Sequence, residues 1–366
     1  MRVLIAAGGT GGHIYPGIAV AQELVRRDAN VAVRFVGTQR GLETRLVPQA
    51  GFELSLIDSA GLKNVRLMAR LKGGLLLPRS FLAAWKLIRD FRPDVVIGAG
   101  GYVSGPVVMM AALLGRPTMV MESNALPGVT NRILARFVDR AAVSFEQALP
   151  FFRGKAVVTG NPVRRAFFEI PPKRRDGARF SVLVFGGSQG ARAINNAIIE
   201  ALGELKRSPV PLRIRHQTGV ADLERVQAAY AKAGWNADVS EVTAYIDNIM
   251  QEFGAADLIV CRAGATTTAE LIAAGKASLM IPFPYAADDH QRKNAEAMRD
   301  SGAARMILEQ ELNASTLAKQ IIELATTPAA VDAMEAASRR MARGDAAAAA
   351  VDMIEKLTKS KDEDEG

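Results

Sequence analysis

A histidine follows a glycine-rich turn close to the start of the chain. The stretch GGTGGH, residues 8–13, places four glycines before His13, between the apolar run VLIAA and a helix-like segment. Glycine lets the backbone approach an oxygen-rich group closely, and the N–H groups at the start of a helix favour negative charge. An imidazole with its ordinary pKa of about 6.5 can accept a proton at neutral pH. The stretch therefore indicates an anion site beside a general base, unless His13 only caps the helix or packs beneath the turn.

The second half of the chain opens with a turn of the same kind. The run VLVFGGSQGAR places the glycines of residues 186–190 between an apolar run and a helix-like segment, as in the first half. The chain thus repeats one unit, and each copy predicts an anion-binding turn. Two doubly wound domains that face each other across a cleft would direct both turns at one space.

Short, continuous apolar runs alternate with helix-like segments along both halves. Strands that are buried on both faces have this pattern, which is typical of parallel sheets covered by helices. We therefore expect an α/β protein of two Rossmann-like doubly wound domains facing across a cleft. The predicted strands are Val3–Ala7, Val31–Val36, Asp94–Gly98, Pro117–Met121, Phe180–Phe185, Leu212–His216, Leu258–Cys261 and Ser278–Ile281.

The length of 366 residues fits two domains. The periodic pattern breaks at residues 161–180, where prolines accompany a run of basic residues, so this segment is the candidate linker. We expect an N-terminal domain over 1–162 and a C-terminal domain over 163–340. A helix over about 340–358 is expected to pack back on the N-terminal domain, and the acidic segment 359–366 is expected to be a disordered tail.

Composition restricts the class of protein. Hydrophobic residues make up 49% and charged residues 23% of the chain, as in ordinary folded proteins. The single cysteine, Cys261, ends an apolar run and is expected to be a core thiol of a cytoplasmic protein. The uncharged segment 95–115 contains five glycines and a proline, so it predicts a strand, a glycine loop and a short buried helix rather than a membrane span. The net charge of +8 indicates an anionic partner.

Several classes of anion-binding protein are excluded. Neither glycine turn continues into the Gly-Lys-[Ser/Thr] of a P-loop. The second predicted strand, in VAVRFVGTQR, lacks the acidic residue with which nicotinamide-binding folds hold a ribose. Aromatic residues make up only 6% of the chain and no recognition motif occurs, so the anionic partner is not nucleic acid.

A second polar constellation lies within residues 261–295. Glu270 falls in what we expect to be the first turn of a helix, and Gln291 follows the next apolar run. A carboxylate is repelled by a diphosphate but can accept from both hydroxyls of a ribose, so Glu270 is a candidate sugar-binding residue. The alternatives are that Glu270 complements the helix N-terminus and that Gln291 and Asn294 are ordinary caps.

Six motifs occur in order along residues 1–355: GGTGGHIYPG, GGYVSGP, ESNALPGVTN, GNPVR, GGSQGAR and RAGATTTAE with the later DDHQ and NA. The series resembles that of the MurG family of bacterial peptidoglycan N-acetylglucosaminyltransferases. The resemblance implies the two-domain B-type glycosyltransferase fold and a peripheral location at the cytoplasmic face of the cell membrane. It also implies an inverting transfer of N-acetylglucosamine from UDP-N-acetylglucosamine to the C4 hydroxyl of the muramoyl sugar of undecaprenyl-diphospho-muramoylpentapeptide, which converts lipid I to lipid II in peptidoglycan synthesis.

On the acceptor side, the resemblance implies that the backbone of residues 8–12 holds the acceptor diphosphate and that His13 takes the proton of the attacking hydroxyl. Asn124 would orient that hydroxyl or the donor sugar. The family commonly has His-Glu-Gln-Asn where this chain has MESN, so roles tied to that His or Gln are in doubt at Met121 and Ser123. The implied acceptor-side residues are Thr10, Gly11, Gly12, His13 and Asn124.

On the donor side, the resemblance implies that the turn of Ser188 holds the UDP diphosphate and that Arg164 helps to neutralise it. Arg164 is alternatively a linker residue paired on the surface. The backbone of Ile246 would meet uracil, and Gln291 would contact the hexose. The body of the chain has no D-x-D pattern, so we expect no metal and no other cofactor. The implied donor-side residues are Arg164, Ser188, Ile246, Ala265, Thr266, Thr267, Thr268, Ala269, Glu270 and Gln291.

Residues 62–93 mix Lys and Arg with leucines and aromatic residues and contain a single acidic residue, Asp90. Such a surface binds anionic lipid headgroups, so we expect contact with the cytoplasmic membrane surface. The alternative is a solvated helix with a buried apolar stripe. The other implied partners are UDP-N-acetylglucosamine, lipid I and cell-wall synthesis proteins.

A second enzyme class, UDP-N-acetylglucosamine 2-epimerase, stays open because it shares the two-domain fold and the donor. It has no lipid acceptor. The basic, apolar stretch 62–93 and the motif GGYVSGP therefore favour the transferase.

Overall fold

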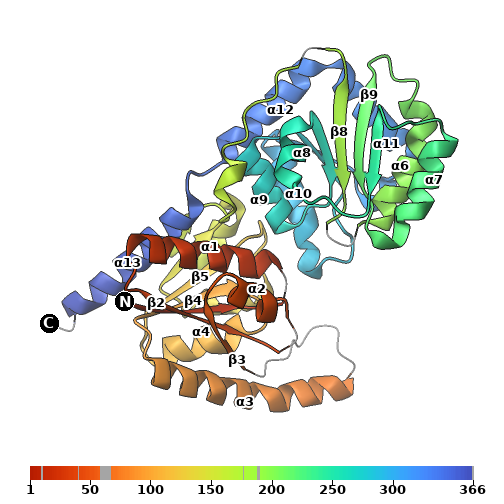
Figure 1. Ribbon diagram of the computed structural model, residues 1–366. Helices are drawn as coiled ribbons and strands as arrows, with labels where there is room; N and C mark the ends of the chain where they lie inside the picture. Colours follow the sequence, from red (N-terminus) through yellow and green to blue (C-terminus); the bar gives the residue numbers. More distant parts are fainter. Residues whose placement is uncertain (10, 40, 58–66, 176, 188–189, 365–366) are drawn as a thin grey trace. The chain divides into compact units, whose positions relative to one another are not determined.

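A computed structural model describes residues 1–366 except 10, 40, 58–66, 176, 188–189 and 365–366 (Figure 1). The chain divides into two compact units, which are described separately. Unit 1 consists of Met1–Val163 and Arg343–Gly366, and unit 2 of Arg164–Ala342.

Unit 1 is built on a seven-stranded parallel sheet with the strand order β3-β2-β1-β4-β5-β6-β7. The order reverses between β1 and β4, and ligands of such sheets bind where the carboxyl ends of the strands meet this reversal. The strands are β1 (Arg2–Ala7), β2 (Ala32–Gly37), β3 (Glu53–Leu56), β4 (Val95–Gly100), β5 (Thr118–Glu122), β6 (Arg140–Val143) and β7 (Ala156–Val158).

Helices cover both faces of this sheet, because successive residues of β1 point to opposite sides. Val3 and Ile5 pack with one hydrophobic cluster, which includes Ile354 of α13, and Leu4 and Ala6 pack with another. Figure 1 shows α13 lying along α1, while α3 and α4 cover the other face. The helices of unit 1 are α1 (Gly11–Arg27), α2 (Glu43–Gln49), α3 (Leu67–Phe91), α4 (Ser104–Leu113), α5 (Val129–Leu134), the 3-10 helix η1 (Glu146–Phe152) and α13 (Ala346–Asp364).

Helix α13 extends to Asp364, so the backbone is helical in part of segment 359–366, for which the acidic sequence predicted a disordered tail. Arg27 of α1 helps to hold α13. Its guanidinium pairs with Asp352 at 2.6 Å and donates to the carbonyl of Ala348 at 3.0 Å.

Unit 2 repeats the plan with a six-stranded parallel sheet in the order β10-β9-β8-β11-β12-β13. The order reverses between β8 and β11, the counterparts of β1 and β4. The predicted α/β class with two doubly wound parallel sheets is therefore confirmed. The strands are β8 (Phe180–Phe185), β9 (Leu212–Gln217), β10 (Ser240–Thr243), β11 (Leu258–Cys261), β12 (Ser278–Met280) and β13 (Ala304–Met306).

The core of unit 2 lies between the central strands and the helices, with Val182, Val184 and Ile198 fully or almost fully buried. The helices are η2 (Arg165–Phe167), α6 (Arg192–Leu205), η3 (Val220–Asp222), α7 (Leu223–Lys232), α8 (Ile249–Ala255), α9 (Ala265–Ala274), η4 (Ala287–Asp289), α10 (His290–Asp300), η5 (Glu309–Glu311), α11 (Ala314–Thr326) and α12 (Pro328–Met341).

The uncharged segment 95–115 forms β4, a glycine loop and the short helix α4, as predicted. Across the described part of the chain, none of the helices combines the length and the apolar character that a membrane crossing requires.

Candidate functional site

The first glycine turn connects β1 to α1, at the strand-order reversal of unit 1. The N–H of Gly8 donates to the carbonyl of Gly100 at 3.2 Å, and the N–H of Gly9 donates to Oε2 of Glu43 at 3.0 Å. These two N–H groups are therefore engaged within the protein, whereas the resemblance implied that the backbone of residues 8–12 holds the acceptor diphosphate. The start of α1, at Gly11 and Gly12, is a helix N-terminus, where backbone N–H groups suit an anion. Thr10 lies outside the described residues.

His13 is half-buried on the first turn of α1, and its Nδ1 lies 3.2 Å from the carbonyl oxygen of Gly8. A carbonyl oxygen can only accept, so Nδ1 carries the proton in this hydrogen bond. In the neutral form of His13 the lone pair is then on Nε2, and this nitrogen can accept a proton.

The motif GGYVSGP supports this arrangement from the end of β4. Gly100 and Gly101 have φ of 120° and 84°, which other residues rarely adopt. A Cβ on Gly101 would lie 2.2 Å from the carbonyl oxygen of Gly8. The buried hydroxyl of Ser104 accepts from the N–H of Gly100 at 3.0 Å and lies 2.8 Å from the carbonyl of Ala6. The motif GGYVSGP and the first glycine turn therefore pack directly against each other.

Asn124 is half-buried, and its position depends on a buried carboxylate two residues earlier. Oε1 of Glu122 accepts from the backbone N–H of Asn124 at 2.9 Å and from its side-chain amide at 3.0 Å. Oε2 of Glu122 accepts from the N–H of Gly128 at 3.0 Å and from the amide of Asn131 at 2.9 Å. The motif ESNALPGVTN is therefore folded around Glu122, and this fixes Asn124.

The two departures from the family motif both face the protein. Met121 is buried in the core of unit 1. The hydroxyl of Ser123 donates to Oδ1 of Asn161 at 3.0 Å, which joins this loop to the motif GNPVR. Both side chains are therefore engaged within unit 1.

The second glycine turn connects β8 to α6 in unit 2. Gly190 has a φ of 76°, and a Cβ there would lie 1.9 Å from the carbonyl oxygen of Thr218. Asn195 of α6 also donates to that carbonyl, at 3.0 Å. Only glycine therefore permits the close packing of this turn on the end of β9. Ser188 lies outside the described residues.

Helix α9 follows β11 and starts at Ala265, directly after Gly264. From the sequence, Glu270 was expected in the first turn of this helix. The helix starts earlier than expected, so Glu270 lies in its second turn, and this weakens the alternative that Glu270 only complements the helix N-terminus. Ala265, Thr266 and Thr267 are half-buried. The hydroxyl of Thr268 donates to the carbonyl of Gly264 at 2.9 Å, and Ala269 is buried, so these two side chains face the protein.

Glu270 is mostly buried, and Oε1 lies 3.6 Å from the guanidinium of Arg164. Burial raises the pKa of the Glu270 carboxyl to about 7, although Arg164 opposes this shift. Arg164 also lies over the ring of Phe167, with 5.0 Å from Cζ to the ring centroid. The pair brings together two residues that were predicted from separate motifs. Arg164 remains mostly exposed, so it can also meet an anion.

Gln291 joins the loops that follow β11 and β12. Its Oε1 accepts from the N–H of Ala263 at 3.3 Å and from the N–H of Phe283 at 3.0 Å, which leaves the amide Nε2 to donate elsewhere. Asn294 is buried and donates to the carbonyl of Ala263 at 3.1 Å, so its role is structural. Ile246 lies between β10 and α8 with a buried side chain, so any contact with a base would be made by its backbone.

Two other titratable groups have structural positions. His216 is fully buried between Asn195 and Tyr230, and burial lowers its pKa to about 3, so it is neutral. Cys261 is a buried thiol in β11, and burial raises its pKa. Over the residues that the structure describes, no group of three or more His, Cys, Asp or Glu side chains could hold a metal ion.

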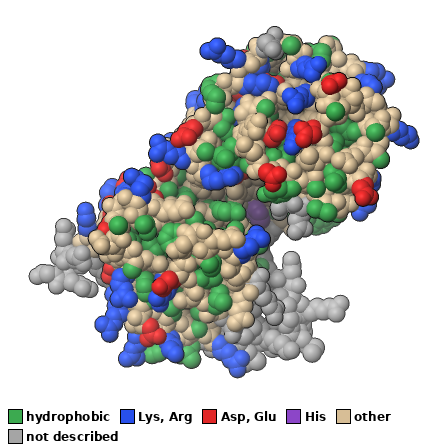
Figure 2. Space-filling model, viewed as in Figure 1, with side chains coloured by type: hydrophobic (Ala, Val, Ile, Leu, Met, Phe, Trp, Pro, Cys, Tyr) green, Lys and Arg blue, Asp and Glu red, His purple; other side chains and the backbone are tan. Residues whose placement is uncertain are grey.

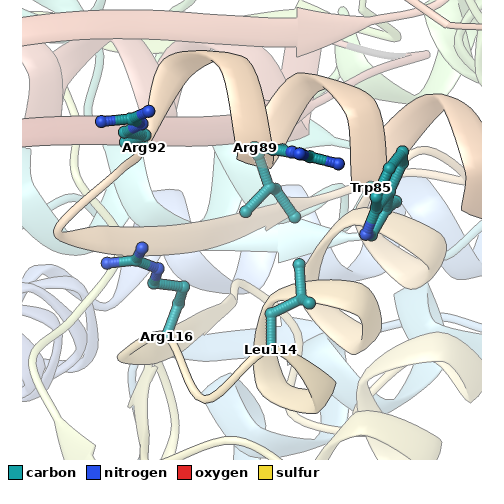
Figure 3. Close-up of a pocket in the computed structure, with 6 residues that line it drawn as sticks. Trp85, Arg89, Arg92, Leu114 and Arg116 are labelled. Carbon is teal, nitrogen blue, oxygen red and sulfur yellow. The ribbon is translucent and has the colours of Figure 1, made fainter.

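A basic pocket of about 400 Å³ lies between the ends of α3 and α4 (Figure 3). We call it the arginine pocket; its lining residues are Trp85, Ile88, Arg89, Arg92, Leu114 and Arg116. Arg89 lies 5.2 Å from the ring centroid of Trp85. None of the described residues that line the pocket is acidic. Figure 2 shows Lys and Arg side chains along the border of unit 1 where Figure 1 draws α3. The side chains of residues 62–78 lie outside the described part.

Comparison with known proteins identifies the family. The glycosyltransferase family 28 N-terminal domain matches residues 3–143, and the C-terminal domain of the same family matches residues 181–354. A UDP-N-acetylglucosamine–N-acetylmuramyl-(pentapeptide) pyrophosphoryl-undecaprenol N-acetylglucosamine transferase from Syntrophus aciditrophicus (strain SB) is 49% identical, over 92% of this chain and 93% of the relative. The enzyme of the same name from Myxococcus xanthus (strain DK1622) is 48% identical, over 95% of this chain and 90% of the relative.

Comparison with solved structures supports the same family. The crystal structure of Acinetobacter baumannii MurG matches with a TM-score of 0.82 and 31% identity, over 97% of this chain and 99% of that chain. A UDP-GlcNAc 2-epimerase from Neisseria meningitidis matches with a TM-score of 0.69 at 14% identity, over 97% and 100% of the two chains, which shows a shared fold alone. The chain therefore belongs to glycosyltransferase family 28 and, within it, to the MurG family of N-acetylglucosaminyltransferases.

Proposed function

We propose that this chain transfers N-acetylglucosamine from UDP-N-acetylglucosamine to the C4 hydroxyl of the muramoyl sugar of lipid I, with inversion at the anomeric carbon. The observation that carries the proposal is the position of His13. Its Nδ1 is held by the carbonyl of Gly8, and the ring stands at the start of α1, where N–H groups suit an anion such as a lipid-linked diphosphate. The rest of the chemistry follows from this base and from the donor-side residues of unit 2.

In the reaction, the C4 oxygen of the acceptor attacks the anomeric carbon of the donor sugar. The bond from that carbon to the phosphate oxygen breaks, and UDP leaves with the bonding electron pair. Nε2 of His13 takes the proton of the hydroxyl, so the imidazole becomes an imidazolium. Asn124, fixed by Glu122, orients the hydroxyl or the donor sugar. Attack from the face opposite the leaving group gives inversion.

The donor-side residues stabilise the departing UDP. Negative charge develops on the diphosphate, and fixed backbone N–H groups at the starts of α6 and α9 can stabilise it without reorganising. Arg164 adds a positive charge near this diphosphate, and the carboxylate of Glu270 accepts from the ribose hydroxyls. Ser188, Ile246, Gln291 and the segment Ala265–Ala269 complete the proposed donor site.

We also propose that unit 1 binds the anionic cytoplasmic membrane surface through the arginine pocket and the adjoining part of α3. The pocket offers three guanidinium groups, the indole of Trp85 and the exposed side chain of Leu114, and Leu82 of α3 and Leu113 of α4 are also exposed. Basic side chains around an apolar centre attract anionic headgroups while the apolar side chains enter the interface. A peripheral location of this kind brings the enzyme to a lipid-borne acceptor.

The test is a transfer assay with UDP-N-acetylglucosamine labelled in the sugar and a lipid I analogue, with EDTA present. A labelled disaccharide-lipid is the expected product. Free N-acetylmannosamine with UDP, formed without an acceptor, would assign the chain to the 2-epimerases instead. Loss of transfer in EDTA that Mg²⁺ restores would contradict the expectation that no metal is required.

A further inference from the structure

Glu43, the first residue of α2, is a fully buried carboxylate beside the first glycine turn. Its Oε1 accepts from the N–H of Thr38 at 2.8 Å and from the hydroxyl of Thr38 at 2.9 Å. Its Oε2 accepts from the N–H of Gly9 at 3.0 Å. Burial alone would raise the pKa of this carboxyl, but the hydrogen bonds from Thr38 and Gly9 outweigh burial and hold the pKa below its usual value. Glu43 is therefore ionised at neutral pH.

The surrounding glycines make space for this carboxylate. A Cβ on Gly37 would lie 2.4 Å from Cγ of Glu43, and a Cβ on Gly41 would lie 1.8 Å from Oε2. A Cβ on Gly8 would lie 3.0 Å from Oε1. Three glycines, from the end of β2, the connection to α2 and the first turn, thus converge on one side chain. This convergence indicates that the fold of unit 1 specifies the position of the Glu43 side chain.

Glu43 and His13 contact the same peptide group. The N–H of Gly9, which donates to Glu43, and the carbonyl of Gly8, which accepts from His13, belong to the single peptide bond between Gly8 and Gly9. In a trans peptide these two groups point in opposite directions. The carboxylate and the imidazole therefore bind opposite edges of one peptide plane, in the order carboxylate, N–H, carbonyl, Nδ1–H.

Such a chain of hydrogen bonds strengthens its members. A carboxylate that accepts from an N–H polarises the peptide, and its carbonyl oxygen becomes a better acceptor. In the Ser-His-Asp triad a carboxylate contacts Nδ1–H directly and fixes the tautomer of the histidine. Here a peptide group stands between the two side chains. The consequence is the same: the tautomer with the proton on Nδ1 is favoured, and Nε2 keeps its lone pair.

We propose that Glu43 is a positioning residue for the transfer reaction, which orients and polarises the Gly8–Gly9 peptide and through it holds His13 in the tautomer that can act as a base. This inference rests on the proposed role of His13. It assigns no contact between Glu43 and the substrate. A negative charge beside an anion site is tolerated because its hydrogen-bonding capacity is directed at Thr38 and Gly9.

The first experiment measures the tautomer of His13 in the wild-type protein by ¹⁵N NMR of labelled histidine. The chain has only three histidines, so a His13→Ala spectrum assigns the signals. We expect neutral His13 with its proton on Nδ1, and a mixture of tautomers in Glu43→Gln. A wild-type His13 protonated on Nε2 would overturn the inference without any variant of Glu43.

The second experiment is a double-mutant cycle on the transfer rate. Glu43→Gln should lower kcat by about 10-fold to 100-fold, the scale seen when a group that orients a functional histidine is removed. In the His13→Ala background the same change should alter kcat by less than about twofold, since two residues that act as one unit are not additive. Equal losses of kcat in both backgrounds would show that Glu43 acts only on the fold, and would overturn the inference.

Glu23→Gln is the matched control. Glu23 is a buried carboxylate of α1 that pairs with Arg26 and Arg27, away from the turn. Its loss should lower the melting temperature without changing kcat or the His13 tautomer. Glu43→Asp provides a second variant, which keeps the charge, if Glu43→Gln does not fold. Full activity of His13→Ala would refute the proposed base, while the NMR measurement would still decide whether Glu43 sets the tautomer.

Discussion

Gly100 lies against the imidazole of His13, so closely that a Cβ on Gly100 would come 2.3 Å from Cδ2 of the ring. The same residue, with a φ of 120°, accepts a hydrogen bond from the N–H of Gly8. Gly100 therefore supports both the histidine and the turn that orients it. This contact joins residues that are far apart in the sequence, and it gives the motif GGYVSGP a physical role.

Gly100→Ala should displace the imidazole of His13 and lower kcat by at least about 10²-fold, because a shift of about 1 Å in a reacting group has this cost. Binding of UDP should not change, since unit 2 is untouched. Steady-state kinetics and calorimetric titration with UDP check both expectations. The control is Gly115→Ala, where φ is 66° but a Cβ would have open space. If Gly115→Ala lost as much kcat as Gly100→Ala, the loss would be due to backbone strain alone.

His13→Ala should lower kcat by about 10²-fold to 10⁴-fold, the usual contribution of a general base. The affinity for UDP should persist. With the wild-type enzyme, kcat should fall as the pH decreases and the imidazole is protonated, because protonated Nε2 cannot accept the hydroxyl proton. This acidic limb should be absent from the residual activity of His13→Ala. A variant with unchanged kcat would remove His13 from the chemistry.

The fold was largely predictable because its central strands are continuous apolar runs. All eight predicted strands are present, with ends that differ by at most two residues. Five strands were missed, and four of these, β3, β7, β10 and β13, are the outer strands of the two sheets. An outer strand buries less of its surface and tolerates polar residues, as in SEVT of β10. Periodicity therefore carries little information about it.

The candidate site was predictable in part. The glycine turns, His13 and the pair of Arg164 and Glu270 came from local motifs, and the structure brings the latter two within 3.6 Å. Ser104 lies within the motif GGYVSGP, but the motif alone does not reveal that its hydroxyl contacts Gly100 and Ala6. Glu43 was missed because it contacts the first turn from the start of α2, far away in the sequence, and has no local pattern of its own. The spacing of Gly37 and Gly41 around Glu43 was the one available signal. It becomes meaningful only when the side-chain contacts are known.

The affinity for UDP should increase as the pH rises through about 7. Burial raises the pKa of Glu270 to about 7, and only the ionised carboxylate accepts from both ribose hydroxyls. If only that form binds, the affinity should increase by about tenfold between pH 6 and pH 8. Glu270→Gln should bind more weakly and show no such dependence in calorimetric titrations. Glu296→Gln, which removes a carboxylate paired with Arg292 and Lys293, is the control and should behave as wild type.

Ionisation of Glu270 should destabilise the folded protein, whereas ionisation of an ordinary paired carboxylate stabilises it. Its folded pKa of about 7 is raised above the usual value of 4.5, so the folded protein holds this proton more tightly than the unfolded chain. The resulting stabilisation is complete below about pH 4.5 and is lost as the pH rises through about 7. Without UDP, Glu270→Gln should therefore raise the melting temperature at pH 8. An equal rise at pH 5 would contradict this explanation.

Charge reversal in the arginine pocket should weaken binding to anionic membranes. Each basic residue near such a surface contributes about 1 kcal/mol, which is about fivefold in the binding constant. Arg89→Glu and Arg116→Glu should therefore each reduce sedimentation with phosphatidylglycerol vesicles by at least this factor, and the double variant should lose more. Arg207→Glu makes the same change in net charge on an exposed residue of unit 2 and should bind as wild type. Equal losses in all three single variants would assign the attraction to net charge, and no loss in any of them would refute the membrane surface proposed for unit 1. Transfer to a water-soluble acceptor analogue should be unchanged in the pocket variants, since the pocket contributes no residue to the proposed reaction centre.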